Sequence, residues 1–80
     1  MSMAWKVTRE DVENVLNENG VTVVTCDHDE ERYDVFVDEC YELIDTDKVE
    51  HDVLYGNDMS AQVDYANLSI YEQLVDADKI

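Results

Sequence analysis

The chain has 80 residues, and its 21 Asp and Glu residues against five Lys and Arg residues give a formal net charge of −16. A chain of this length forms one domain, so we treat residues 1–80 as a single domain. Because 45% of the residues are hydrophobic, the composition excludes a disordered acidic tail. The charge also disfavours direct binding to nucleic acid and to anionic membranes.

No stretch of the sequence approaches the roughly 18 apolar residues that a bilayer span requires, and the N-terminus lacks the pattern of a secretion signal. We therefore expect a cytoplasmic protein that binds no membrane. Its two cysteines, Cys26 and Cys40, are too few for a disulfide framework and are expected to be reduced thiols. The chain has no Pro and only two Gly, which favours helices joined by short connections.

The first predicted helix begins after Thr8, whose hydroxyl can cap the free N–H groups of the first turn. Val7 and Val12 have the spacing of a hydrophobic staple. Asn19 and Gly20 end the helix, since Gly20 can adopt the left-handed conformation without strain. These signals predict a short amphipathic helix near the N-terminus.

The β-branched run at residues 21–26 leaves two interpretations open. It is either an extended connection whose valines fill the core or a strand whose one available partner is residues 3–7. The predicted fold class is therefore all-α, a compact bundle of three to four helices. The alternative is an α+β fold with a short two-stranded element from residues 3–7 and 21–26.

Three further helices follow in the sequence. A second helix is expected from about Asp29 to Ile44, and Asp45-Thr46-Asp47 then caps a short third helix that stops at Tyr55-Gly56-Asn57. Asp58 caps the last helix, which we expect to bury a wide apolar face. The residues of that face are Met59, Val63, Ala66, Ile70 and Leu74, flanked by Tyr65, Leu68 and Val75.

Acidic residues concentrate on the second helix. Residues 27–52 hold 12 of the 21 acids and only two cations, Arg32 and Lys48. Six of the acids follow one another at steps of three or four residues, which places them on one helix face: Asp27, Glu31, Asp34, Asp38, Glu42 and Asp45. Glu30 and Glu39 widen this band. Like charges at such spacing cost about 0.2–0.5 kcal/mol per pair in an isolated helix, so a row with so few cations is unusual. It fits either a binding surface or a solvated face that serves solubility or adaptation to high internal salt.

The steps in this row correspond to about 5–6 Å along a helix axis, which resembles the spacing of phosphates along one DNA strand. A rigid helix with such a row can bind the Lys and Arg residues that normally contact phosphate. The predicted partner-binding residues are Asp27, Glu30, Glu31, Asp34, Asp38, Glu42 and Asp45, continued by Asp47, Glu50 and Asp52.

Four tyrosines are candidates for an exposed recognition residue or for half-buried core rings: Tyr41, Tyr55, Tyr65 and Tyr71.

The spacing of the candidate residues does not match that of known metal sites or catalytic motifs. A calcium loop that begins at Asp27 needs Gly at its sixth position and Glu at its twelfth, which hold Arg32 and Asp38. The possible zinc ligands match no common zinc finger: Cys26, His28, Cys40 and His51. The sequence contains no recognisable catalytic triad and no phosphate-binding glycine loop. We therefore predict no metal, no cofactor and no enzymatic activity.

Thr8-Arg9-Glu10-Asp11-Val12 and Leu54-Tyr55-Gly56-Asn57-Asp58-Met59 give the chain a pattern that resembles small acidic proteins of phages and mobile elements. In size and charge it also resembles phage-encoded anti-CRISPR and anti-restriction DNA mimics. That resemblance implies an inhibitor that occupies the basic DNA- or PAM-binding surface of a CRISPR effector or a restriction protein, and it transfers no functional residue. Two alternatives stay open: an acidic structural or adaptor domain from a salt-adapted organism, and a helical protein-interaction module, with homodimerisation as one form of it.

Overall fold

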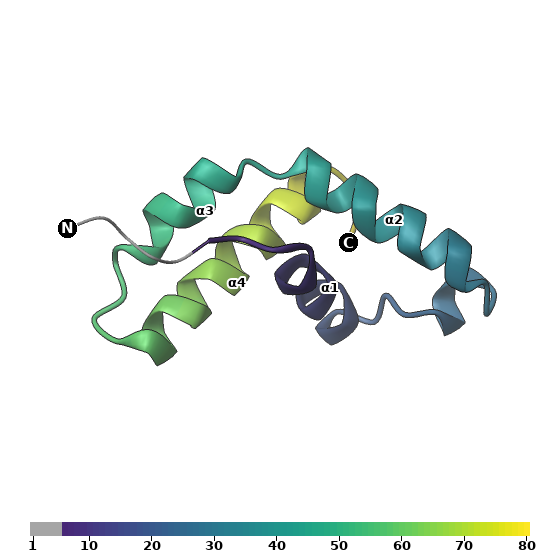
Figure 1. Cartoon of the computed structure of the whole chain (residues 1–80), viewed down its shortest axis with the longest axis horizontal. Helices are drawn as coiled ribbons and strands as arrows, with labels where there is room; N and C mark the ends of the chain where they lie inside the picture. Colours follow the sequence, from purple (N-terminus) through teal and green to yellow (C-terminus); the bar gives the residue numbers. More distant parts are fainter. Residues whose placement is uncertain (1–5) are drawn as a thin grey trace.

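Helices are the only regular secondary structure in the described part of the chain. A computed structural model describes residues 6–80, and these contain no β-strand, which confirms the all-α prediction. The elements in chain order are α1 (Arg9–Glu18), the 3-10 helix η1 (Val24–Cys26), α2 (Glu30–Leu43), α3 (Thr46–Val53) and α4 (Met59–Asp76), as Figure 1 shows. The two-stranded alternative is wrong for residues 21–26, which form a turn and η1. Residues 3–5 of its proposed partner strand lie outside the described residues.

Each α-helix begins at a side chain that caps its first turn. Thr8 and Asp11 form a reciprocal capping box, in which each side chain accepts a hydrogen bond from the backbone N–H of the other. The other three caps are carboxylates, which also suit the positive end of the helix dipole. They are Asp29 of α2, Asp45 of α3 and Asp58 of α4. Part of the acidity of this chain therefore serves local folding.

Two left-handed corners connect the helices. Gly20 follows α1 with a φ of 88°, as its position after Asn19 predicts. Asp27 and His28 then both have a φ of 62°, and they turn the chain from η1 into α2. Left-handed conformations cost roughly 1–2 kcal/mol for residues with a Cβ, although Asp tolerates them better than most. Asp27 consequently lies on this corner and not on the helix that follows it.

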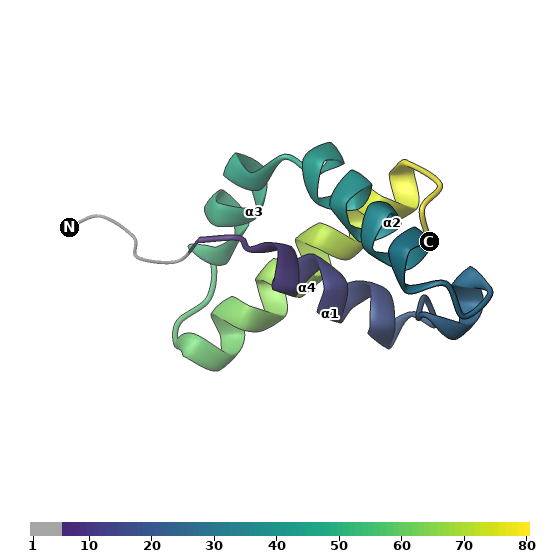
Figure 2. The same ribbon diagram turned by 45° about the vertical axis from the view of Figure 1, so that its right-hand side comes forward.

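The α4 helix forms the centre of the molecule. α3 packs along α4, and α1 packs against both α2 and α4, as the two ribbon views show (Figures 1 and 2). All four α-helices thus contribute to one hydrophobic core, and the molecule measures 44 × 21 × 20 Å. The buried core residues are Val7, Val12, Val15, Leu16, Tyr33, Val37, Cys40, Ile44, Val49, Val53, Ala66, Ile70 and Leu74.

The prediction of a wide buried face on α4 is wrong. Ala66, Ile70 and Leu74 are buried, but the other apolar residues of that prediction are exposed: Met59, Val63, Tyr65, Leu68 and Val75. Leu68 keeps 52% of its surface exposed, whereas the neighbouring Ser69 keeps only 2%. The short helices α1 and α3 cover only part of α4, and the apolar residues on its remaining side stay exposed. None of the helices in residues 6–80 has both the length and the apolar content needed to cross a membrane.

Candidate acidic interface

The α2 helix is anchored through its inner face, which determines which side chains point to solvent. Tyr33 is buried, and its hydroxyl lies 2.7 Å from Glu13 Oε2 and 2.9 Å from Asn17 Oδ1, both on α1. Burial, together with the adjacent Glu13 carboxylate, raises the pKa of Tyr33 to about 12. The neutral phenol therefore holds α2 on α1 and fixes the rotation of α2.

The opposite face of α2 carries the helical part of the predicted row. Glu31, Asp34, Asp38 and Glu42 are all exposed on α2, at steps of three, four and four residues. Glu30 lies beside them in the first turn of the helix. Four carboxylates therefore follow one face of α2 over about 16 Å, at the usual rise of 1.5 Å per residue.

The two ends of the predicted row are not part of α2, and in this respect the sequence prediction is wrong. Asp27 lies on the left-handed corner after η1. Asp45 is the N-cap of α3, where its carboxylate accepts a hydrogen bond from Lys48 N. Its own backbone N–H donates to Gln73 Oε1 of α4, 2.6 Å away. The acids continue beyond α2 onto the exposed residue Asp47 and the half-buried residues Glu50 and Asp52 of α3, but with a change of helix direction at Asp45.

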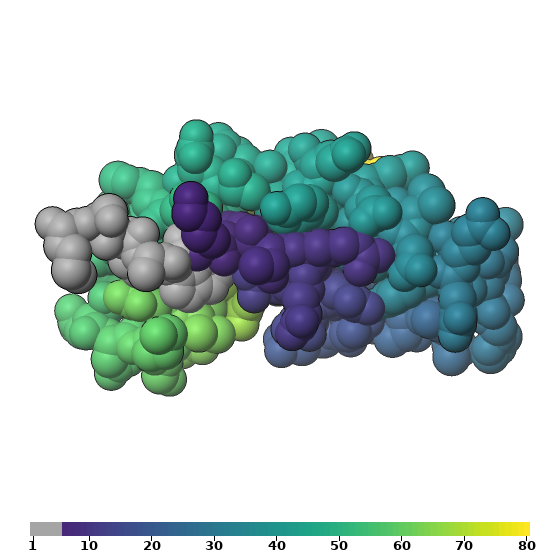
Figure 3. Space-filling view, viewed as in Figure 1, coloured from purple at the N-terminus to yellow at the C-terminus, as the bar shows by residue number. Residues whose placement is uncertain are grey.

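Arg9 lies against the middle of the row, which the sequence analysis missed. From the start of α1 it donates through Nε to Asp38 Oδ1, and its terminal nitrogens lie 3.3 Å from Asp34 Oδ1 and 3.7 Å from Glu13 Oε1. The bond to Asp38 is the main cause of the raised pKa of Arg9. Figure 3 shows the N-terminal part of the described chain, in purple, lying beside the teal surface of α2. A signal was present, because a cation in the first helical turn opposes the helix dipole and needs another partner.

Three further cations pair with acids of the same region. Arg32 lies 2.7 Å from Asp27, Lys48 lies 3.0 Å from Asp52, and Lys79 lies 3.9 Å from Glu39. Four of the ten predicted partner-binding acids are therefore partly neutralised: Asp27, Asp34, Asp38 and Asp52. Within residues 6–80 the other six form no ion pair: Glu30, Glu31, Glu42, Asp45, Asp47 and Glu50. The strongest negative potential is thus expected from these six carboxylates rather than from the middle of the row.

Asp52 occupies a more protected place than the other acids of the set. The nearby Ser69 hydroxyl and the Lys48 ammonium lower the pKa of Asp52 below its ordinary value. Ser69 Oγ itself is buried and forms no hydrogen bond of standard geometry within the described residues. The salt bridge with Lys48 remains the only short contact of the Asp52 carboxylate among residues 6–80.

The cysteines and the acids are not arranged around a common point. In residues 6–80 no group of three or more His, Cys, Asp and Glu side chains lies close enough to hold a metal ion. Both cysteines are free thiols, and burial raises the pKa of Cys40, which makes its thiol less reactive.

Comparison of the chain with protein-family models, curated proteins and solved structures gave no match. The functional interpretation therefore rests on the geometry of the acidic surface.

Proposed function

We propose that this protein is a non-enzymatic inhibitor that imitates DNA. In this proposal its acidic surface binds the basic DNA-binding surface of a CRISPR effector or a restriction protein in the host cytoplasm and excludes target DNA, including the PAM. The observation that carries the proposal is a set of six acids without an ion pair within residues 6–80, placed along α2 and α3. They are Glu30, Glu31, Glu42, Asp45, Asp47 and Glu50.

The spacing of these charges is compatible with such a surface. From Glu31 to Glu42 the α2 face carries one carboxylate per about 5.5 Å of helix, whereas one strand of B-DNA carries a phosphate per about 3.4 Å of axis. The row is therefore sparser than a DNA strand, and the acids of α3 add to it. A basic channel that accepts a duplex has more than enough Lys and Arg to pair with each of these carboxylates.

Net charge contributes separately from the interface itself. At −16 the whole molecule is attracted to a basic cleft, so we expect fast association that slows strongly as salt increases. A variant that only lowers the net charge will slow association. A variant that removes interface contacts will also speed dissociation, and this difference separates the two contributions.

The structure determines which substitutions test the proposal. Reversing Asp34 and Asp38 to Lys places new cations against Arg9 and disturbs the packing of α1 on α2. The better variant is Glu31→Gln/Glu42→Gln/Asp47→Asn, because these three exposed acids form no ion pair within residues 6–80. Its matched control is Glu10→Gln/Asp76→Asn/Asp78→Asn, which removes the same charge from exposed positions on α1, at the end of α4 and just after it.

The assay begins with capture of partners from host lysate on the immobilised protein. The affinity of each captured protein for its DNA is then measured with and without the inhibitor. We expect the interface variant to lose inhibition by about tenfold or more, since tenfold corresponds to about 1.4 kcal/mol. The control variant is expected to keep its potency at physiological salt. If the partner binds DNA equally well in the presence of the protein, the proposal is wrong.

The excess of acids and the scarcity of Lys also favour a second function, an acidic structural or adaptor domain from a salt-adapted organism. Thermal melts in dilute and in multimolar KCl distinguish the two. A salt-adapted domain unfolds in dilute buffer, whereas a DNA mimic stays folded there.

A further inference from the structure

The α4 helix exposes an apolar row on the side away from its buried residues. Tyr65, Leu68, Tyr71 and Val75 follow one another at steps of three, three and four residues, which places them on one face. They keep 40%, 52%, 38% and 39% of their surfaces exposed. We call these four residues the α4 outer face. An exposed apolar row of this kind on a small protein is typical of a binding surface.

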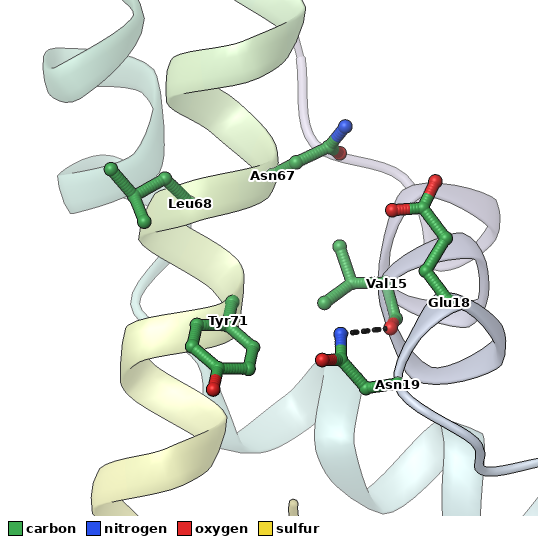
Figure 4. Close-up of a pocket in the computed structure, with 6 residues that line it drawn as sticks. All are labelled: Val15, Glu18, Asn19, Asn67, Leu68 and Tyr71. Carbon is green, nitrogen blue, oxygen red and sulfur yellow. Dashed lines mark hydrogen bonds between the residues drawn. The ribbon is translucent and has the colours of Figure 1, made fainter.

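A cleft lies on each side of this row, and Leu68 borders both. The first cleft has a volume of about 310 Å³ and lies between α4 and the end of α1. Figure 4 shows Tyr71 and Asn67 facing Val15 and Asn19 across it. The second cleft has a volume of about 250 Å³ and lies between α4 and α3. The paired rings of Tyr55 and Tyr65, with centroids 6.1 Å apart, line this second cleft.

The rim of these clefts is acidic. Asp64 and Glu72 lie four residues before and after Leu68 on α4, which itself contains no Lys or Arg. Glu18 lines the first cleft and Asp52 lines the second. Lys48 is the one cation among the lining residues of either cleft, and it is paired with Asp52.

We propose that the α4 outer face binds a basic amphipathic helix of a partner protein. Apolar side chains of that helix enter the two clefts on either side of Leu68, as ridges of one helix pack into the grooves of another. Its Lys and Arg residues pair with Asp64 and Glu72. From Tyr65 to Val75 the face extends about 15 Å, which matches a partner segment of roughly three helical turns.

Charge complementarity identifies this occupant in preference to a second copy of the chain. Two α4 outer faces in contact would bring Asp64 and Glu72 of each copy together, and each copy carries a charge of −16. No unpaired cation among the residues that line the clefts would offset this repulsion. A basic amphipathic helix can pack its apolar side chains on the row and pair its cations with the acidic rim.

This inference concerns residues outside the ten acids of the proposed DNA-mimicking surface, apart from Asp52 at the edge of one cleft. It therefore stands or falls separately from the proposed function. A partner that binds here does not need to bind DNA.

The test uses a synthetic fluorescent peptide of 18 Leu and Lys residues, with the Leu residues on one helical face. A scrambled peptide of the same composition and charge is the control probe. The protein variant Leu68→Ser/Val75→Ser removes the ridge without changing the charge. Its matched control, Val24→Ser/Leu54→Ser, removes two side chains that are exposed elsewhere, at 63% and 59%. Circular dichroism melts verify that all variants are folded.

We expect the amphipathic peptide to bind at least tenfold more tightly than the scrambled peptide. We also expect Leu68→Ser/Val75→Ser to weaken it at least tenfold, while Val24→Ser/Leu54→Ser leaves its affinity unchanged. Equal affinities for the two peptides, or no loss in the ridge variant, would show that binding is merely electrostatic and would overturn the proposal. Sedimentation of the wild type as a dimer that the ridge variant dissociates would also overturn it, since the face would then be an interface between copies.

Discussion

The exposed faces of α2 and α4 differ in chemistry although both lie opposite buried stripes of one core. On α2 the outward row consists of carboxylates, with buried residues such as Val37 and Cys40 behind it. On α4 the outward row is apolar, and the buried stripe behind it includes the hydroxyl residue Ser69. Both helices leave apolar residues exposed, since Val35 and Leu43 of α2 keep 51% and 48% of their surfaces exposed. Only on α4 do the exposed apolar residues follow one another at steps of three or four residues and so form a row. An exposed apolar row therefore carries more information about binding than an acid in a chain with 21 of them.

The difference between the two helices follows from what surrounds them. α4 packs against α1 and α3 and supplies buried residues from Ala66 to Leu74, mostly in its C-terminal half. Its apolar residues nevertheless occur around its whole circumference, and those on the outer side are exposed. α2 packs mainly on α1, through a narrower stripe that Tyr33 anchors.

The largest expected difference in the free energy of unfolding is between two substitutions on opposite sides of α4. Ile70→Ala removes a fully buried side chain and should lower the free energy of unfolding by about 2–5 kcal/mol. Leu68→Ala, two residues earlier, should change it by no more than about 0.5 kcal/mol, because Leu68 is half exposed. Urea denaturation measures both values. If the two substitutions cost the same, the α4 outer face is covered in solution and the contrast between the two helices is lost.

A second test concerns the anchor of α2. The pKa of Tyr33, about 12, lies above the ordinary value of 10.0, so the fold favours the neutral phenol. Its contribution is fully present below pH 10 and is lost as the pH rises through 12. At about 1.4 kcal/mol per pKa unit, the stability of the wild type relative to Tyr33→Phe should fall by about 2 kcal/mol from pH 9 to pH 12. Chemical denaturation at several pH values measures this difference, because the other tyrosines and the lysines titrate equally in both proteins. A difference that stays constant over this range would mean that Tyr33 does not hold α2 on α1.

Local signals made most of the fold predictable from the sequence. Thr8, Asp45 and Asp58 cap helices where expected, since a cap depends only on residues within one turn. The inner side of α2 was predictable from its helical periodicity, which places the buried residues Tyr33, Val37 and Cys40 on one side. Residues 21–26 were not predictable, because β-branched residues fit a strand and a core-filling turn equally well.

The sequence predicted which acids of α2 belong to the candidate site, but it did not predict which of them are paired with cations. The exposed acids of α2 lie where their spacing put them, whereas the pairing of Asp34 and Asp38 with Arg9 joins residues that are 25 and 29 apart in the chain. No local pattern reports a contact over that separation. The exposure of Leu68 was missed for a similar reason, because it depends on which sides of α4 the other helices cover.

A third prediction changes the acidic face without removing an acid. Arg9→Gln releases Asp34 and Asp38, so the row on α2 becomes continuous and inhibition should become stronger. The melting temperature should fall by less than about 5 °C, because exposed ion pairs contribute little. The matched control is Lys6→Gln, which changes the net charge equally at another exposed position. The affinity of the amphipathic peptide for α4 should change equally in Arg9→Gln and in Lys6→Gln. A larger gain in peptide binding for Arg9→Gln would show that the two faces are coupled.

The smallest expected effect comes from Asp52, the residue that the two surfaces share. It belongs to the acids of α3, and it also lines the cleft between α3 and α4. Because the Ser69 hydroxyl and Lys48 lower its pKa in the folded protein, its contribution to stability is present above the ordinary pKa of Asp. That contribution is lost as the pH falls through the lowered value. Asp52→Asn should therefore lower the melting temperature at pH 7 by no more than roughly 2 °C, and the difference from wild type should vanish in acid.

The same variant measures how independent the two faces are. If they act separately, Asp52→Asn should weaken inhibition and peptide binding slightly and to a similar degree, since it removes one rim carboxylate from each. Its effect should add to that of Glu31→Gln, because Glu31 is not a hydrogen-bond or ion-pair partner of Asp52 in the described part of the chain and does not line the cleft that Asp52 borders. Isothermal titration of the single and double variants provides the comparison. A strongly non-additive result would mean that α2 and α4 contribute to one continuous interface, in which the acids and the apolar row contact the same partner.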